Sequence, residues 1–350
     1  MKLYQKLILF LNLAVIASTI FSYISPHIAP TTTAFFAVFG LAFPWLVFAN
    51  VLFILIWAIN KPIYASLSII CLAIGFNNVD KFFGTHGIQD DRPNKKNLTV
   101  ATFNMQLSKN VVYIKDEKKK GKEIKRYLNF LKSFKGADVF CGQEMGISSH
   151  KWLSQTSIFK HVHRIEDKST AIYSKYPIVN VGEIDFGTNV NSCVWADINF
   201  NGEPVRIYNA HLQSNRISGK ESEIIESGKW EKETLFGLRD MFGKYQQHST
   251  TRANQATLIR KHADQCGKPF VICGDFNDPP QSYVYEVISD DLNDSFRCAG
   301  SGIGTSFNGV IPALRIDYIL SDKVFDIYTH QIIRKGQSDH YPIVSMLALP

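Results

Sequence analysis

The chain has 350 residues, 45% of them hydrophobic, so it is long enough for a membrane segment and one large domain. Its 38 basic and 31 acidic side chains give a formal net charge of +7. That mild surplus attracts anionic substrates or lipid head groups but is not typical of nucleic-acid-binding proteins. The six cysteines form no CxxC motif and no zinc-like Cys/His spacing, so we expect buried, unpaired thiols.

The first 80 residues carry almost no charge and contain three apolar runs. These runs predict about three transmembrane helices, at 7–23, 34–59 and 63–78. A cleaved signal peptide would begin like the first run, but no small-residue cleavage site follows it. The most apolar part of the third run, residues 63–76, gives about 21 Å of helix, which is shorter than the ~30 Å thickness of the hydrocarbon layer.

The few charges near these runs predict the topology. Lys2 and Lys6 indicate a cytoplasmic N-terminus, and Lys61 indicates that the second turn is cytoplasmic. The first loop, 24–33, has no Lys or Arg and fits the outer side. If the third run spans, the following domain is extracytoplasmic, and this is the arrangement we expect. Should the source be a Gram-negative bacterium, that side is the periplasm. If the third run only dips into the membrane, that domain is cytoplasmic.

Residues 81–97 predict a linker, and a second domain is expected over 98–350. Runs rich in β-branched and aromatic residues predict strands at 98–104, 138–143, 160–164, 169–174, 178–186, 191–200, 204–210, 269–273, 315–320, 325–333 and 341–347. Helical patterns occur at 122–134, 227–242, 251–266 and 282–289. Many strands with a few helices between them predict an α+β fold, in which two packed sheets are flanked by helices.

Several predicted strands end in a polar residue capable of chemistry. In the stretch 271–280 an apolar run ends abruptly at Asp275 and Asn277, which are two apart and project the same way from an extended backbone. Taken singly, each such residue has a structural explanation as a strand-end cap, a surface carboxylate or a core histidine. Six endings with complementary chemistry point instead to a shared site: Asn104, Glu144, His211, Asp275 with Asn277, Asp317, and Asp339 with His340.

The sequence resembles the DNase I-like endonuclease/exonuclease/phosphatase superfamily from about residue 98 to the end. The motifs that carry the resemblance are Phe103-Asn104, Gln143-Glu144, Ser174-Lys175-Tyr176-Pro177-Ile178, Asn209-Ala210-His211-Leu212, Gly274-Asp275-Phe276-Asn277, Arg315-Ile316-Asp317-Tyr318-Ile319 and Ser338-Asp339-His340-Tyr341-Pro342. The resemblance implies a four-layer α/β/β/α sandwich and metal-dependent hydrolysis of phosphoesters.

The resemblance also implies roles for individual residues. Glu144, helped by Asn104, would hold Mg²⁺, or Mn²⁺ in its place, and Asp339 would lie beside the metal or its waters. The metal would neutralise charge that develops on the phosphoryl oxygens.

The remaining residues would act on water and phosphate. Asp275 would position or deprotonate the attacking water, with Asn277 fixing its direction. His340 would contact the scissile phosphate and be oriented by Asp317. His211 would flank the phosphate from the opposite side as a donor or general acid, although the sequence shows no acidic partner that would orient it.

Three positions indicate which branch of the superfamily the chain resembles most. His211 stands where apurinic-site nucleases usually carry Tyr, whereas DNase I-like and sphingomyelinase-like members carry His. Inositol-polyphosphate 5-phosphatases have Trp before the Gly-Asp-x-Asn motif and an Asp-Arg order in the next one. Here Cys273 precedes that motif and Arg315 comes before the aspartate, so the paired-histidine phosphodiesterases fit better.

We therefore expect a membrane-anchored, Mg²⁺-dependent phosphodiesterase with no protein partner implied. A lipid head-group phosphodiester is attractive as the substrate because the predicted helices hold the domain close to a bilayer. A nuclease acting on DNA or RNA is equally compatible with the site. The alternative outside the enzymes is an anchored binding module with a decayed site, and the intact polar set argues against it.

Overall fold

The computed structural model describes residues 2–86, 96–188, 190–215, 232–309, 313–335 and 337–350. They divide into two compact units. The first comprises Met1–Phe83, Asn215–Asn254 and Asp278–Val287, and the second comprises Gly84–Ser214, Gln255–Asn277 and Ile288–Pro350. Within the predicted linker 81–97, residues 87–95 lie outside the described residues. Just before them β1 (Phe83–Thr85) pairs with β11 (Ser301–Ile303).

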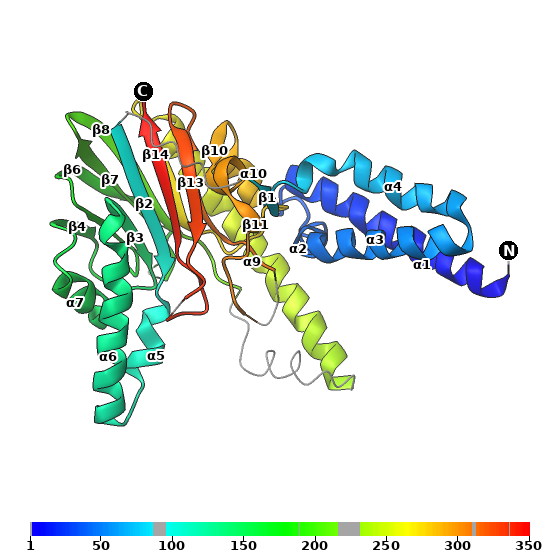
Figure 1. The fold of residues 1–350 in the computed structure, drawn as a ribbon, viewed down its shortest axis with the longest axis horizontal. Helices are drawn as coiled ribbons and strands as arrows, with labels where there is room; N and C mark the ends of the chain where they lie inside the picture. Colours follow the sequence, from blue (N-terminus) through cyan, green and yellow to red (C-terminus); the bar gives the residue numbers. More distant parts are fainter. Residues whose placement is uncertain (1, 87–95, 189, 216–231, 310–312, 336) are drawn as a thin grey trace. The chain divides into compact units, whose positions relative to one another are not determined.

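The N-terminal part of the first unit is helical, with α1 (Leu3–Ile24), α2 (Ala37–Leu41), α3 (Phe43–Asn60) and α4 (Ala65–Ile74) (Figure 1). Two helices, Leu3–His27 and Phe43–Asn60, are long and apolar enough to cross a membrane, whereas Pro62–Ile74 is a shorter apolar helix. By length, then, the structure supports two of the three predicted spans.

The predicted helix 34–59 is divided into two helices. The chain turns at Ala42, between α2 and α3, and Pro44 lies in the first turn of α3. Proline has no backbone N–H and its ring clashes with the preceding turn, so one continuous helix through this position would be strained.

These N-terminal helices bury polar side chains and expose apolar ones. Asn12 donates to Ser68 Oγ at 2.8 Å and accepts from Trp57 Nε1 at 3.0 Å, while Asn50 donates to Thr19 Oγ1 at 2.9 Å. Large apolar residues on the same helices are exposed, among them Leu3, Leu7, Phe10, Leu55, Ile59 and Ile74. This distribution is the reverse of that in a helical bundle surrounded by water.

The second unit contains two six-stranded sheets (Figure 1). The first has the strand order β13 (Asp326–Ile332), β14 (Ile343–Leu349), β2 (Lys96–Asn104), β3 (Val139–Gln143), β5 (Ala171–Ser174), β4 (His161–Arg164). The second has the order β10 (Leu292–Asp294), β12 (Asp317–Asp322), β9 (Phe270–Asp275), β8 (Glu203–His211), β7 (Ser192–Phe200), β6 (Ile178–Ile184). All eleven predicted strands are therefore present, with ends that differ by a few residues.

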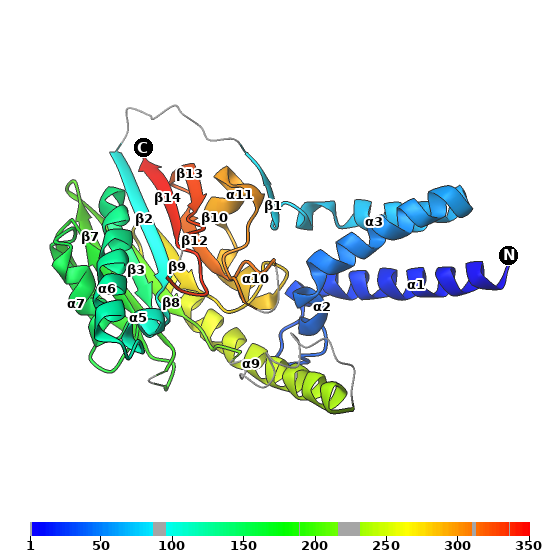
Figure 2. The same ribbon diagram turned by 60° about the horizontal axis from the view of Figure 1, so that its bottom comes forward.

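The two sheets pack face to face because successive side chains along each strand point to opposite faces, and one face of each sheet is apolar. Val100 of β2 and Ile207 of β8 point into one core shared by both sheets, whereas Phe103 points to the outer side. There the ring centroid of Phe103 lies 5.6 Å from that of Phe130 of α6 (Glu117–Lys132), which covers the first sheet (Figures 1 and 2). On the outer side of the second sheet, Tyr208 lies 2.9 Å from His262 Nδ1 of α9. The four-layer α/β/β/α sandwich is therefore confirmed.

Helix α9 (Lys232–Asp264) differs from its prediction, which had two helices at 227–242 and 251–266. Residues 227–231 lie outside the described residues, and from 232 onward the helix is continuous. Ser249, which lies in the predicted gap between those helices, donates to the Tyr245 carbonyl of its own helix at 2.7 Å. The described residues also form four shorter α-helices: α5 (Lys109–Val112), α7 (Ile147–Gln155), α10 (Tyr283–Ser289) and α11 (Ser295–Ala299).

Candidate active site

Strand pairing gathers three of the predicted site residues at one end of the second sheet. Strands β8 and β9 are parallel and place His211 opposite Asp275. Strand β12 is antiparallel to β9 and places its first residue, Asp317, opposite Asp275 on the other side. The carboxylate of Asp275 is therefore flanked by a histidine and a second carboxylate, all of them buried.

The first sheet contributes the other residues at the same end of the sandwich. Parallel pairing of β2 with β3 places Asn104 beside Gln143, so Glu144 follows directly. Asn104 Nδ2 donates to Asp275 Oδ2 of the second sheet at 2.9 Å and lies 3.3 Å from Glu144 Oε1. This side chain therefore ties the ends of the two sheets together.

His340 is held by a buried aspartate. Its Nδ1–H donates to both carboxylate oxygens of Asp317, at 3.1 and 3.0 Å, and its Nε2 lies 3.7 Å from Asp275 Oδ2. Burial alone would lower the pKa of His340, but the charges of Asp317 and Asp275 outweigh it and raise the pKa to about 10. The ring is therefore a protonated donor at neutral pH, with Nε2 directed toward Asp275.

The buried carboxylate of Asp275 has a raised pKa. Burial raises its pKa to about 6, although the charges of His340 and His211 oppose that rise. A carboxylate whose pKa lies close to the working pH both accepts and releases a proton readily. Its Oδ1 accepts the backbone N–H of Asn277 at 2.9 Å, and the Asn277 side-chain amide donates to the Leu212 carbonyl at 3.1 Å. These two bonds fix the turn that follows β9.

His211 is buried, and among the described residues neither of its ring nitrogens has a hydrogen-bond partner. Its Nε2 lies 3.9 Å from Asp275 Oδ2 and 3.8 Å from Glu144 Oε1. An acidic group that orients the other ring nitrogen is not found in the described part of the chain. A buried, unsatisfied imidazole beside two carboxylates is well suited to meeting a ligand.

Oxygen donors suited to a divalent metal lie beside this group. Glu144 carries a carboxylate that is about one-quarter exposed, next to the Asn104 amide. Hard cations prefer such oxygen ligands together with water, so Glu144 and Asn104 fit a divalent ion. Asp275, Asp317 and His340 form a second group with ligand-like spacing. Because His340 is protonated and bonded to Asp317, it is poorly suited to binding a metal.

Asp339 is connected to the site through a residue that the sequence did not indicate. Gln106 Nε2 donates to Asp339 Oδ2 at 2.7 Å, and the Gln106 backbone N–H donates to Asn104 Oδ1 at 3.0 Å. Gln106 has φ 45°, and Glu144 and Asn277 also adopt left-handed backbone conformations, with φ of 46° and 54°. Such conformations are uncommon for residues other than glycine, least so for Asn, and they cluster at functional sites.

Two further residues close to the site, Gln143 and Asn209, were given no role in the sequence analysis. Gln143 Nε2 donates to Asn209 Oδ1 at 2.6 Å, which joins β3 of one sheet to β8 of the other. Both side chains are fully buried. The sequence offered one signal for these two residues, because both lie in motifs that also contain a site residue. Gln143 directly precedes Glu144, and Asn209 lies two residues before His211.

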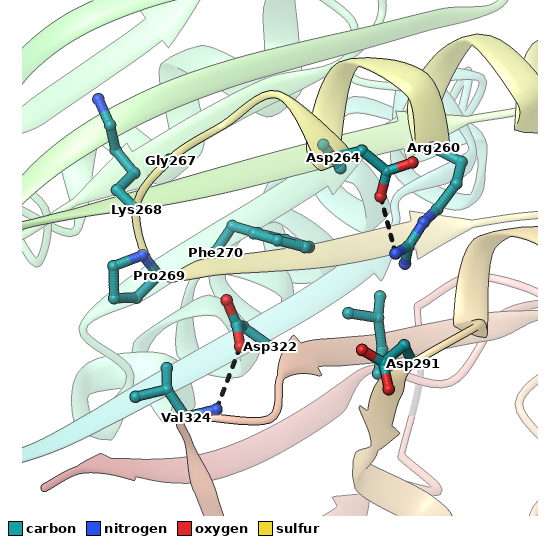
Figure 3. A pocket seen from close by; sticks show the side chains of 11 residues that line it. Arg260, Asp264, Gly267, Lys268, Pro269, Phe270, Asp291, Asp322 and Val324 are labelled. Atoms are coloured by element: carbon teal, nitrogen blue, oxygen red, sulfur yellow. Dashed lines mark hydrogen bonds and ion pairs between the residues drawn. The ribbon is translucent and has the colours of Figure 1, made fainter.

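A pocket of about 430 Å³ lies at the opposite end of β9, beside Lys268, Pro269 and Phe270 (Figure 3). Its charged groups have partners: Arg260 bonds Asp264 at 2.7 Å, Asp322 accepts the Val324 N–H at 3.1 Å, and Lys268 pairs with Asp197 outside the pocket at 2.9 Å. Because Asp275 ends the strand that Phe270 begins, this pocket is separate from the candidate active site.

Residues 101–340 match the model of the endonuclease/exonuclease/phosphatase family. The chain belongs to that family. It is accordingly a hydrolase of phosphoester bonds, and members of this family typically depend on divalent metals. Residues 5–82 match a domain of unknown function, DUF8431. No curated protein matches the chain significantly.

Solved structures of the family share the fold. An endonuclease/exonuclease/phosphatase family protein from Bacteroides thetaiotaomicron is 16% identical with a TM-score of 0.53, covering 74% of this chain and 100% of that one. A humanized TDP2 from D. rerio is 14% identical with a TM-score of 0.51, covering 72% and 99%. A mannosyl-6-phosphatase from Bacteroides thetaiotaomicron is 17% identical with a TM-score of 0.50, covering 72% and 100%. At these identities the likeness concerns the fold alone.

Proposed function

We propose that the chain is a membrane-anchored, Mg²⁺-dependent phosphodiesterase. The observation that carries the proposal is the place of Asp275 Oδ2, 3.9 Å from His211 Nε2 and 3.7 Å from His340 Nε2. A carboxylate between two imidazoles provides a base, a donor to a phosphate oxygen and a proton source for the leaving group. Glu144 and Asn104 would hold Mg²⁺, with Asp339 beside it, and the ion would supply neutralisation of the charge on the phosphoryl oxygens.

The residues of the chain divide the reaction between them. A water oxygen attacks phosphorus in line with the leaving oxygen, and Asp275 takes the proton of that water while Asn277 fixes the direction of attack. His340, oriented by Asp317, donates to a non-bridging phosphate oxygen and offsets the growing negative charge. His211 gives its proton to the leaving oxygen as the old phosphorus–oxygen bond breaks.

Membrane anchoring is supported by the reversed polarity of the N-terminal helices. Asn12, Thr19, Asn50 and Ser68 are fully buried between helices whose outer surfaces are apolar. In a bilayer, polar side chains turn inward and hydrogen-bond across helices, whereas in water they would turn outward. The contacts of Asn12 with Ser68 and of Asn50 with Thr19 follow the membrane pattern.

The contacts between these helices also favour an extracytoplasmic catalytic domain. Tyr23, at the end of α1, donates to the Cys71 carbonyl near the end of α4 at 3.0 Å, so the two helices end side by side. The Tyr23 ring also lies 6.0 Å from Phe43, the first residue of α3. If Lys2 and Lys6 keep the other end of α1 in the cytoplasm, the chain leaves α4 on the outer side, even though α4 is short. An alkaline phosphatase fusion at residue 90 tests this arrangement and should be active. An inactive phosphatase fusion, together with an active cytoplasmic reporter at the same residue, would reverse the orientation.

A lipid head-group phosphodiester is the substrate class that anchoring favours. The second candidate is a nuclease, because nothing in the site distinguishes a lipid from a nucleic-acid phosphodiester. A panel of DNA, RNA, sphingomyelin, phosphatidylinositol and phosphomonoesters, assayed with Mg²⁺ and with chelator, separates the two. Hydrolysis of lipid vesicles but not of DNA or RNA is the expected result, and exclusive cleavage of nucleic acid would establish the second candidate instead.

A further inference from the structure

The segment Asp278–Val287 follows the candidate catalytic turn directly in the sequence. Only Asp278, Pro279 and Pro280 separate Asn277 from Gln281. Two consecutive prolines have fixed φ angles, so this connection is stiff. Gln281 and Val284 are fully buried, and Asp278 is nearly so. A displacement of Gln281 would therefore be passed along a short, rigid path to Asn277.

The N-terminal helices bind this segment through specific contacts. Gln281 Nε2 donates to the carbonyl of Ser22, in the last turn of α1, at 3.0 Å. Gly40 of α2 packs on the Gln281 backbone so closely that an added Cβ would lie 2.0 Å from the Gln281 carbonyl oxygen. Further along the segment, Glu286 pairs at 3.2 Å with Lys81, which follows the last of these helices. The predicted membrane helices are therefore docked on this segment, and they are not joined to the rest of the chain by the linker alone.

The segment is also fixed by α9. Arg252, which is fully buried, bonds the Asp278 carboxylate at 3.0 Å, and the Tyr245 hydroxyl donates to the same oxygen at 2.8 Å. Thr250 of the same helix donates to the Pro30 carbonyl, in the loop between α1 and α2, at 3.1 Å. The segment thus has α1 and α2 as one set of partners and α9 as another, and α9 itself contacts the loop between α1 and α2.

We infer that α1 and α2 are a positioning part of the enzyme. By holding Gln281, they set the place of the turn that carries Asp275 and Asn277, so that turnover depends on the packing of the anchor. This inference rests on the proposed phosphodiesterase function for its kinetic readout. The docking itself is measurable without any activity.

The substitution Gly40→Ala tests the inference in the full-length protein reconstituted in lipid nanodiscs. A Cβ essentially never approaches another heavy atom closer than 3.0 Å, so the Gln281 backbone must move by about 1 Å. The nearby Ser25 hydroxyl, 2.6 Å from the added Cβ, is a side-chain group and can rotate away. A misplacement of about 1 Å can lower turnover on the order of 10²-fold. Gly243→Ala on α9 is the matched control, because a Cβ there meets nothing within 4 Å.

Two measurements are made on wild type, Gly40→Ala and Gly243→Ala: hydrolysis of bis(p-nitrophenyl) phosphate with Mg²⁺, and hydrogen exchange of peptides covering 278–287. We expect Gly40→Ala to lower kcat with little change in KM and to raise exchange in these peptides, while Gly243→Ala changes neither. Gln281→Met, which removes the donor to Ser22, should have the same effects in weaker form.

Three outcomes are distinguishable. Wild-type kcat and exchange in both Gly40→Ala and Gln281→Met would overturn the inference. Raised exchange in 278–287 with unchanged kcat would also overturn it, because the docking would then be structural only. An inactive wild type with raised exchange in Gly40→Ala would contradict the proposed function, and with it the link from the anchor to turnover, while leaving the docking contact established.

Discussion

The pair formed by Asp317 and His340 gives a sharp prediction, tested by Asp317→Asn. The rise of the His340 pKa from 6.5 to about 10 corresponds to roughly 5 kcal/mol in favour of the protonated ring, at about 1.4 kcal/mol per pH unit. Asp317 is the leading charge behind that rise, and removing one neighbouring charge shifts a pKa by about 1–3 units. We expect the pKa of His340 to fall by that amount and kcat to fall by about 10²–10⁴-fold.

Stability should change in a defined direction. Because the folded pKa is raised, the His340 contribution is fully present below pH 6.5 and is lost as the pH rises through about 10. Asp317→Asn should therefore lower the free energy of unfolding at neutral pH, by about 1–4 kcal/mol for a shift of that size. The assays are NMR titration of labelled histidines in chelator, urea denaturation and turnover. Asp322→Asn, at the other end of β12, is the control. An unchanged His340 pKa together with near-wild-type turnover in Asp317→Asn would refute this reasoning.

Three further predictions concern the metal, pH and a buried ion pair. Glu144→Gln keeps the side-chain volume but removes the charge of the metal ligand. Turnover should therefore need a much higher Mg²⁺ concentration and be partly rescued at saturating Mg²⁺. An unchanged dependence of turnover on Mg²⁺ would exclude Glu144 as a ligand. Burial lowers the pKa of His330 to about 3, so the unfolded chain alone takes up this proton below pH 6.5. The free energy of unfolding should then fall by about 1.4 kcal/mol per pH unit as the pH drops from 6.5 toward about 3, and His330→Gln should flatten that slope in urea titrations. Asp294→Asn leaves buried Arg315 without its bidentate partner at 2.7 and 3.1 Å and should cost about 3–5 kcal/mol in the same assay, whereas a loss below about 1 kcal/mol would contradict this.

The sandwich was predictable because its strands alternate clearly. Val100 and Phe103 lie on opposite faces of β2, and a period of two residues in the sequence already separates them. The gathering of site residues was also predictable in outline, since strands that end in polar residues share one edge of the sandwich. His211 lies opposite Asp275 because β8 and β9 are parallel neighbours in the sheet. That strand pairing could not be predicted from the sequence pattern.

Other features depend on contacts that no local pattern encodes. The role of Gln106 arises from a left-handed turn that brings its amide to Asp339, 233 residues away. Helix α9 runs through Ser249 because its hydroxyl is satisfied inside the helix. The docking of Gln281 on Ser22 joins positions 259 residues apart, and the sequence showed only a polar residue after two prolines.

The most direct test of the proposed function is hydrolysis of bis(p-nitrophenyl) phosphate by the full-length protein in nanodiscs. It compares Mg²⁺ with chelator, and wild type with Asp275→Ala, Asn277→Ala and His340→Ala. We predict Mg²⁺-dependent turnover in wild type and a loss of at least ~10² in each variant. Strands β9 and β12 should keep wild-type hydrogen-exchange protection in all three, because Asp275 is the last residue of β9 and Asn277 and His340 lie outside the strands. Near-wild-type turnover in His340→Ala, or turnover in wild type that chelator leaves unchanged, would contradict the account.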